Sequence, residues 1–160
     1  MLWENILFIA YYQTNIGKIG IAEEDGSLTH VNINPQKWPA GCFEQETPLL
    51  AEAARQIKEY LAGKRKTFNL PLSPKGTAFQ MKVWAALQTI PYGETATYKD
   101  IAVKVASPLG CRAIGMANNK NPIGIIVPCH RVIGSNGKLI GYAGGLDIKA
   151  KLLNLEQQYK

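Results

Sequence analysis

Three segments near the start of the chain alternate loosely between apolar and polar positions, at residues 6–12, 17–22 and 27–33. A period of two is typical of strands that bury one face. Asn15-Ile16-Gly17 and Glu24-Asp25-Gly26 separate the segments, and both contain residue types that favour tight turns. The pattern therefore predicts an antiparallel meander of three strands.

A helical pattern follows, after a loop over residues 34–46 that is rich in proline and glycine. Thr47 is a good N-cap residue, and Pro48 suits the first helical position. Gly63 is expected to follow the last helical turn. Between these limits the apolar residues recur at three- and four-residue spacing, which predicts one buried face made of Leu49, Leu50, Ala53, Ala54, Ile57, Tyr60 and Leu61.

The segment Ser73-Pro74-Lys75-Gly76 is the expected boundary between two domains. Residues 1–75 then form a small N-terminal α+β domain, with the three-stranded antiparallel sheet and one helix. Residues 76–160 form a mostly helical C-terminal domain. The predicted fold class is α+β.

Capping patterns predict successive helices in the C-terminal domain. Thr77 with Gln80 and Thr97 with Asp100 each match a capping box, and Ser107-Pro108 supplies another N-cap with a first-turn proline. The helices behind Thr97 and Ser107 are short and joined by a tight turn, which is typical of a helix-turn-helix. Small residues surround Arg112 in the second of them, so this helix is suited to approach a groove closely.

The stretch from Ile125 to Val132 carries the candidate chemistry. Its β-branched residues predict a buried strand that ends at Pro128 and presents Cys129 at its end. A thiol reacts as thiolate, and the adjacent His130 and Arg131 are residue types that favour that form. The alternative from these residues alone is that Cys129 is a buried, inert cysteine.

The last part of the chain combines a glycine-rich segment with a helix. Five glycines lie between Gly134 and Gly145 around Tyr142, which fits a lid, a pocket wall or, for the first half, a surface hairpin. A helix is expected from about Leu146, with Lys149 and Glu156 on or near its apolar face.

Composition and charge narrow the function. Residues 1–60 hold 4 Lys+Arg against 8 Asp+Glu, and residues 61–160 hold 14 against 4, which favours a polyanion as partner of the second half. No apolar run approaches the ~20 residues of a membrane span, and Met1 to Asn5 do not resemble a signal peptide. Two histidines without a Cys-x-x-Cys motif form no zinc-binding cluster, so no metal is expected. The three cysteines form no close pair, which argues against disulfides and favours a reducing, cytoplasmic location.

Pro128-Cys129-His130-Arg131-Val132 resembles the signature of the O6-alkylguanine-DNA alkyltransferases, also called methylated-DNA–protein-cysteine methyltransferases. The resemblance covers residues from about 76 to 158 and, more weakly, the N-terminal half. Further segments match in order and spacing: Pro91-Tyr92-Gly93-Glu94-Thr95 with Tyr98, Arg112-Ala113-Ile114-Gly115, Asn121-Pro122, and Gly141-Tyr142-Ala143-Gly144-Gly145-Leu146.

The resemblance implies direct, irreversible transfer of an alkyl group from O6 of guanine in DNA to Cys129, once per molecule and without a cofactor. O4-alkylthymine stays open as a second substrate. His130 would be the base, acting through a bridging water, and Glu156 would hold its imidazole. Tyr98 would donate a proton toward the departing purine.

The resemblance also implies contacts with double-stranded DNA whose damaged nucleotide is flipped into a pocket. Arg112 matches the finger residue that enters the base stack, in a helix-turn-helix that this family places in the minor groove, and Lys99, Ser107 and Ser135 would contact the DNA. Tyr142 and Asn121 would belong to the pocket for the base, with backbone groups near Val132 and Ala143 reading the guanine edge. The protein is expected to act as a monomer, with cooperative binding to DNA left open.

The sequence departs from the family pattern at several places. Ala143 stands where some members have serine, and the N-terminal half lacks the Cys and His that bind structural zinc in some members. Gly124 stands near the expected pocket mouth, where other members have bulkier residues. A roomier site that accepts larger alkyl groups is therefore predicted.

Two other functions are alternatives to alkyl transfer for this sequence. A non-catalytic binder of alkylated DNA would share the fold, but relatives of that kind replace the cysteine that is present here as Cys129. A thiol hydrolase would use Cys129 and His130 directly. Neighbouring residues of an extended segment point to opposite sides, which makes that pair awkward without a water.

Overall fold

Three antiparallel strands open the chain, as the alternation predicts: β1 (Leu7–Thr14), β2 (Gly17–Glu24) and β3 (Ser27–Ile33). The computed structural model describes residues 6–35, 38 and 41–160. Asp25 and Gly26 join β2 to β3 with φ of 52° and 78°, the positive values that a tight hairpin turn of type I′ requires. The hairpin signals thus fix the register, which pairs Ile21 with Ala10 and with Val31.

The sheet has a fourth strand that the sequence pattern does not predict. Strand β4 (Cys42–Glu44) pairs in parallel with β1 and gives the order β3-β2-β1-β4, so the expectations of a three-stranded sheet and of a loop throughout 34–46 were wrong. Three residues are too few to display an alternating pattern, and their pairing with β1 depends on a tertiary contact. The fold class, α+β, is confirmed.

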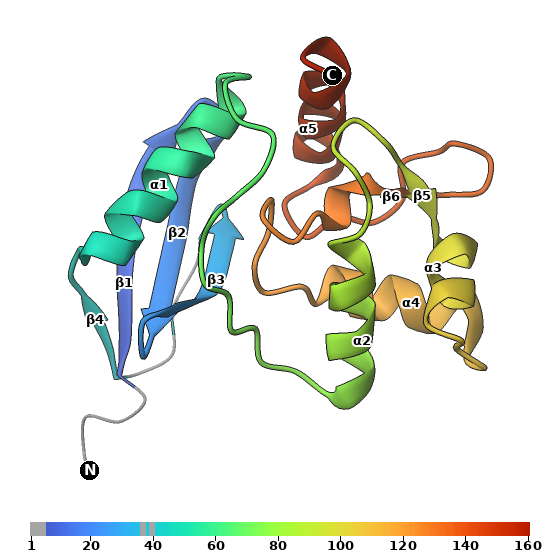
Figure 1. Ribbon diagram of the computed structural model, residues 1–160, viewed down its shortest axis with the longest axis horizontal. Coiled ribbons are helices and arrows are strands. Elements are labelled where there is room, and N and C mark those ends of the chain that lie inside the picture. Colours follow the sequence, from blue (N-terminus) through green and yellow to red (C-terminus); the bar gives the residue numbers. More distant parts are fainter. Residues whose placement is uncertain (1–5, 36–37, 39–40) are drawn as a thin grey trace. The chain divides into compact units, whose positions relative to one another are not determined.

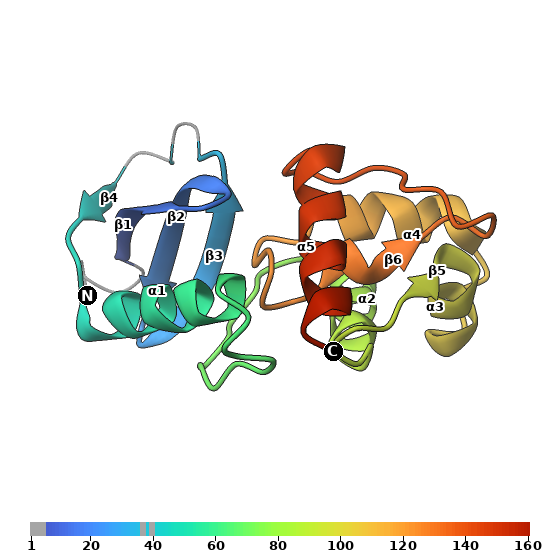
Figure 2. The ribbon, with the colours of Figure 1, turned by 90° about the horizontal axis from the view of Figure 1, so that it is seen from above.

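Helix α1 (Pro48–Leu61) runs along one face of this sheet (Figures 1 and 2). Thr47 caps it by accepting a hydrogen bond from the Leu50 amide, and Gly63 follows it with φ of 77°, both as predicted. The predicted face is buried except for Leu49, which is half-buried. Its buried members are Leu50, Ala53, Ala54, Ile57, Tyr60 and Leu61.

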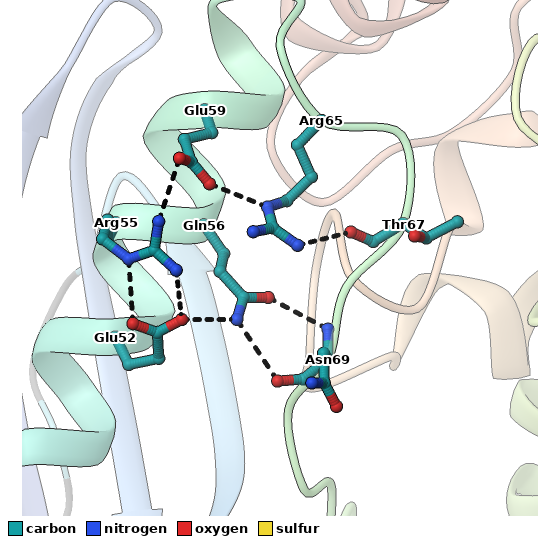
Figure 3. A network of polar contacts seen from close by, with 7 residues as sticks. All are labelled: Glu52, Arg55, Gln56, Glu59, Arg65, Thr67 and Asn69. Atoms are coloured by element: carbon teal, nitrogen blue, oxygen red, sulfur yellow. Dashed lines mark hydrogen bonds and ion pairs between the residues drawn. The ribbon is translucent and has the colours of Figure 1, made fainter.

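A polar network on the other side of α1 holds the chain that leaves the helix (Figure 3). The side-chain amide of Gln56 donates to the Asn69 carbonyl and accepts from the Asn69 amide, at 3.2 and 3.0 Å. Arg65 donates to Glu59 and to the Thr67 carbonyl. Residues 65–69 thus run beside α1, held by side-chain hydrogen bonds, and form no strand.

Four helices form most of the C-terminal part: α2 (Ala78–Leu87), α3 (Tyr98–Lys104), α4 (Gly110–Asn119) and α5 (Leu146–Gln158). Both capping boxes, at Thr77 and at Thr97, are present as predicted. Two short strands, β5 (Ala96–Thr97) and β6 (Val132–Ile133), pair in parallel. The short helices α3 and α4 follow one another as a helix-turn-helix requires (Figure 1).

The start of α4 differs from the prediction. The helix begins at Gly110 behind Leu109, so Ser107 is not its N-cap and Pro108 is not in its first turn. The Ser107 hydroxyl instead accepts a hydrogen bond from the Leu109 amide at 3.1 Å, which stabilises the connecting turn. Side-chain bonds of this local kind compete with helix capping and cannot be distinguished from it by residue type.

The chain divides into two compact units. The first consists of Met1–Lys75 together with Pro122–Ile126, and the second of Gly76–Asn121 together with Val127–Lys160. Segment 122–126 therefore returns to the first unit although it lies within the predicted C-terminal domain. None of the helices among the described residues is long and apolar enough to cross a membrane.

Candidate active site

The segment before Cys129 is a series of turns, and the prediction of a buried strand there was wrong. Ile123 forms a single bridge with Val31 of β3, and the chain then turns at Ile125, whose φ is 69°. The Ile126 amide donates to the Gly124 carbonyl at 2.7 Å, so local turns use backbone groups that a strand would present to a neighbour. The apolar side chains at 123, 125 and 127 are nevertheless buried. An apolar run predicts this burial but not the backbone path.

Cys129 opens a short 3-10 helix (Cys129–Arg131) and is 6% exposed. The Cys129 amide donates to the Val127 carbonyl at 2.8 Å, and the side-chain amide of Asn121 donates to the same carbonyl at 2.8 Å. Burial raises the pKa of the Cys129 thiol, whereas a hydrogen bond from Asn121 and the charge of Lys149 lower it. In the resting protein the thiol therefore keeps its proton until a base accepts it.

A completely buried cluster joins His130 and Arg131 to Glu156 of α5. Nε2 of His130 lies 2.7 Å from Oε2 of Glu156, the pairing that the family resemblance implies. Arg131 donates to both carboxylate oxygens at 2.9 and 3.0 Å, and the Gly93 amide donates to Oε1 at 3.0 Å. Arg131 also donates to the Ile90 carbonyl. The sequence suggested that Arg131 favours the thiolate of Cys129, but its guanidinium neutralises Glu156.

The environment of His130 makes it a neutral base. Burial lowers the pKa of His130, and the hydrogen bond and charge of Glu156 oppose this effect only in part. Because Nε2 faces the carboxylate, the neutral ring donates from Nε2 and accepts a further proton at Nδ1. Glu156 then stabilises the imidazolium that this proton creates.

Three further side chains of the second unit interact with the negative charge that Cys129 carries as a thiolate. Burial and the Cys129 charge both raise the pKa values of Tyr98 and Tyr142, whereas burial lowers the pKa of Lys149 and the Cys129 charge raises it. The hydroxyl of Tyr98 and the ammonium of Lys149 donate to one acceptor, the Ile140 carbonyl, at 2.7 and 2.9 Å. Lys149 also donates to the Gly141 carbonyl at 3.4 Å. The site thus contains two phenols that keep their protons and a buried cation.

Lys149 was not among the predicted site residues. Its sequence signal was present, because it occupies an apolar-face position of α5 and is buried there with Leu152 and Glu156. A charged residue at a core position of a helix is uncommon unless it is paired. This exception to the pattern is the signal by which sequence reasoning could have singled out Lys149.

The residues predicted to contact DNA lie on helices and turns of the second unit. Lys99 and Arg112 are exposed on α3 and α4, Ser135 is exposed in the turn at 134–137, and Ser107 is half-buried in the turn before α4. No hydrogen bond between these four residues is among those of the described chain. Their role as DNA contacts therefore stays a prediction.

The residues predicted for the base pocket have different environments. Val132 is buried in β6, and Asn121 and Tyr142 are half-buried. Ala143 is exposed in a turn that the Gly145 amide closes on the Tyr142 carbonyl at 2.9 Å. The Tyr142 hydroxyl is buried, and no hydrogen-bond partner for it lies among the described residues. A phenol of this kind is suited to a ligand.

Gly124 lies in the first unit and packs against β3. Its amide donates to the Val31 carbonyl at 3.0 Å, and an added Cβ would lie 3.2 Å from the same oxygen. Proline at this position would remove that hydrogen bond. If Gly124→Pro were used to test the predicted range of alkyl groups, its transfer rates would therefore reflect a disturbed fold as well as a smaller pocket.

No group of His, Cys, Asp or Glu side chains within residues 6–35, 38 and 41–160 is arranged to hold a metal ion. The site instead combines a buried thiol with the imidazole of the next residue, which a carboxylate holds. A helix-turn-helix with an exposed arginine lies in the same unit. Fold and site together define a class of proteins that combine thiol chemistry with nucleic-acid binding.

Comparison with known families identifies the group within this class. Residues 78–158 match the family described as "6-O-methylguanine DNA methyltransferase, DNA binding domain". Residues 7–74 match "6-O-methylguanine DNA methyltransferase, ribonuclease-like domain". The chain belongs to the 6-O-methylguanine DNA methyltransferase family.

Individual relatives support this assignment over nearly the whole chain. The constitutive methylated-DNA–protein-cysteine methyltransferase of Bacillus subtilis is 51% identical over 152 residues, which cover 91% of this chain and 92% of the relative. The methylated-DNA–protein-cysteine methyltransferase of Methanosarcina acetivorans is 50% identical over 154 residues, covering 94% and 98%. The crystal structure of Mycobacterium tuberculosis OGT in complex with DNA superimposes with a TM-score of 0.89 at 41% identity, covering 95% of this chain and 94% of that chain.

Proposed function

We propose that this protein repairs alkylated DNA by transferring an alkyl group from O6 of guanine to its own Cys129. The sulfur forms a bond to the alkyl carbon, the bond between that carbon and O6 breaks, and its electron pair stays on the purine. The observation that carries the proposal is a buried Cys129 thiol followed directly in the chain by His130, whose imidazole lies 2.7 Å from the Glu156 carboxylate. A thiolate suits attack on a saturated carbon.

The proton of the thiol has a destination in this arrangement. Neutral His130 accepts it, through the bridging water that the family resemblance implies, and becomes an imidazolium paired with Glu156. Lys149 supplies a positive charge that lowers the pKa of Cys129 and stabilises the thiolate. The low dielectric of a buried site strengthens both interactions.

The purine must also gain a proton as it leaves. Tyr98 is the donor that the family resemblance implies, and its raised pKa, caused first by burial, keeps the proton on the phenol at neutral pH until the purine accepts it. Its hydroxyl donates to the Ile140 carbonyl in the free protein. Entry of the base therefore exchanges that acceptor for an atom of the purine, which ties base entry to a local rearrangement around Ile140.

The product is a thioether on Cys129. No group in the site is suited to remove an alkyl group from sulfur, so each molecule reacts once. The transfer is balanced by the thiol, the proton donor and the substrate, and it requires no cofactor. Because the reaction consumes a free thiol, we place the protein in the reducing cytoplasm.

The proposed partner is double-stranded DNA, which one molecule engages as a monomer. Residues 61–160 carry the excess of basic residues. Among them, Arg112 is exposed on α4. A damaged guanine must leave the stack to reach a buried sulfur. Arg112 would occupy the vacated place, with Lys99, Ser107 and Ser135 on the DNA backbone and Asn121, Val132, Tyr142 and Ala143 around the base.

Labelled DNA tests the proposal against its two alternatives. The protein is incubated with a duplex that carries one O6-[methyl-³H]methylguanine, and the label on protein is followed beside the label on DNA. Label on wild-type protein but not on Cys129→Ser supports transfer. Binding of the duplex without transfer would favour a non-catalytic binder. Inertness toward the duplex would favour a thiol hydrolase with another substrate.

A further inference from the structure

The carboxyl-terminal end of α4 holds the turn that carries the nucleophile. The side-chain amide of Asn118 donates to the Cys129 carbonyl at 3.3 Å, and that of Asn121 donates to the Val127 carbonyl at 2.8 Å. Two amides from one helix end thus bind the turn at Cys129 itself and two residues before it. Asn121 was predicted as a site residue from the sequence, whereas Asn118 was not.

Asn118 is 3% exposed, and stability gives little reason for an amide at this place. Its Oδ1 is buried, and no hydrogen-bond partner for it lies in the described part of the chain. A buried acceptor without a partner costs free energy that an apolar side chain of similar size would avoid. The amide is therefore explained by what its Nδ2 does, which is to hold the Cys129 carbonyl together with the Val132 amide, which donates to the same oxygen.

That carbonyl belongs to the peptide group between Cys129 and His130. Its orientation sets the direction in which the thiol leaves the backbone on one side and the imidazole on the other. Nearby, the indole of Trp84, 2% exposed on α2, donates to the Ala117 carbonyl at 2.9 Å and holds this end of α4 in place. Asn118 consequently connects a fixed helix end to the one peptide that joins the proposed nucleophile to its base.

We propose that Asn118 is a positioning residue for the transfer, which directs the Cys129 sulfur along the line of attack on the alkyl carbon. The inference rests on the proposed function. Arg112 lies six residues earlier in the same helix, about 9 Å along its axis. One rigid element therefore carries both the proposed DNA contact and the support of the nucleophile, so docking of α4 and alignment of the sulfur depend on the same helix.

Asn118→Leu removes the donor while keeping the volume, and Asn119→Leu is its matched control, because Asn119 is exposed at the end of the same helix. The rate of a single turnover is measured with saturating O6-methylguanine duplex, beside the Kd of the duplex and the Tm of the protein. We expect Asn118→Leu to lower the rate by about 30-fold, since small misalignments of reacting atoms are costly. Its Kd should change less than about twofold and its Tm should not fall, and the control should match wild type.

Asn118→Asp provides a readout that a merely structural role would not move. The ionised carboxylate repels the Cys129 carbonyl, but the protonated acid donates a hydrogen bond to it, and burial raises the pKa of a carboxyl group. The transfer rate of Asn118→Asp relative to wild type should therefore rise as the pH is lowered from 8 to 6.

Two results would overturn the inference. One is an Asn118→Leu variant that transfers the methyl group at the wild-type rate. The other is a loss of rate in Asn118→Leu and Asn118→Asp that follows the loss of Tm in each, with a rate of Asn118→Asp relative to wild type that does not change with pH. Failure of the proposed function would look different, because wild-type protein itself would then acquire no label.

Discussion

Two networks of arginine and carboxylate groups lie in opposite environments of this protein. On α1, Arg55 binds Glu52 and Glu59 at 2.6 and 2.9 Å, and the Arg55 side chain is 53% exposed (Figure 3). At the candidate active site, Arg131 binds Glu156 at 2.9 Å, and the Glu156 side chain is 1% exposed. The distances are alike, but the surrounding dielectric is not.

Solvent exposure decides which of these charge pairs can contribute to function. Water can replace each partner on α1, and hydrogen bonds from Arg55 and Gln56 lower the pKa of Glu52 to about 2 without consequence near neutral pH. Glu156 is buried away from solvent, so Arg131 is needed to balance its charge. The same carboxylate can stabilise His130 when the imidazole is protonated. The buried network is therefore expected to respond strongly to substitution and the exposed one weakly.

The largest effect is expected for Glu156→Gln. It leaves the Arg131 guanidinium buried without its counter-charge and removes the group that would stabilise protonated His130. We expect the transfer rate to fall at least about 100-fold and the free energy of unfolding to fall by about 3 kcal/mol. Single-turnover kinetics and urea unfolding measure the two quantities. Wild-type values in both would mean that the buried pair is dispensable.

Lys149→Met separates catalysis from stability within the buried site. Methionine preserves the length and apolar stem of the side chain, so the Tm should change little, whereas loss of the ammonium raises the pKa of Cys129. The transfer rate at pH 7 should fall by about 10- to 100-fold. The rate of Cys129 modification by iodoacetamide should fall in parallel and recover at higher pH. An unaltered pH dependence of that modification would exclude the assigned role of Lys149.

The stability of the protein is expected to depend on pH through His130, whose pKa is lowered by burial. In the unfolded chain an ordinary histidine binds a proton near pH 6.5, but the buried imidazole does so only at lower pH. Between these two values the unfolded state holds more protons, so the free energy of unfolding decreases as the pH falls, by up to about 1.4 kcal/mol per unit.

Urea unfolding between pH 8 and pH 4.5 checks this dependence for wild type and for His130→Gln. The difference between the two proteins isolates His130 from His30, whose pKa burial also lowers. The difference in free energy of unfolding between wild type and His130→Gln should become smaller as the pH falls. A constant difference would show that His130 does not titrate differently in the folded protein.

The smallest effect is expected for Arg55→Gln on α1. Its ion pairs with Glu52 and Glu59 are exposed, so the Tm should shift by no more than about 3 °C and the transfer rate should be unchanged. Differential scanning calorimetry at low and high salt measures the shift. A large salt-dependent loss of Tm would contradict the contrast between the two networks.

Much of the fold was predictable where local chemistry determines it. The caps at Thr47, Thr77 and Thr97 are formed by residues three positions apart, and the Asp25-Gly26 turn requires positive φ values that these residues tolerate. Strand β4 and the turns before Cys129 were not predictable in this way. Their backbone partners are β1 and Val31, which are distant in sequence and supply no periodic signal.

The candidate site shows the same division. The family resemblance implied the roles of Cys129, His130 and Glu156 as thiol, base and carboxylate, and residue type alone indicated only a thiol next to an imidazole. The partner of Arg131 was misjudged, since adjacency to Cys129 in sequence says nothing about the direction of a side chain in a 3-10 turn. Asn118 gave no signal at all, because an asparagine near a helix end ordinarily belongs to the end of the helix.

Stoichiometry tests the central claim most directly. Wild-type protein is mixed with increasing excess of O6-methylguanine duplex, and the reaction is followed to its end by intact-mass spectrometry and by mapping of the modified peptide. Transfer to Cys129 predicts a plateau at one methyl group per molecule, on the peptide that contains Cys129, with an equal amount of guanine restored. Repair that continues beyond one equivalent, or a methyl group on any other residue, would contradict it.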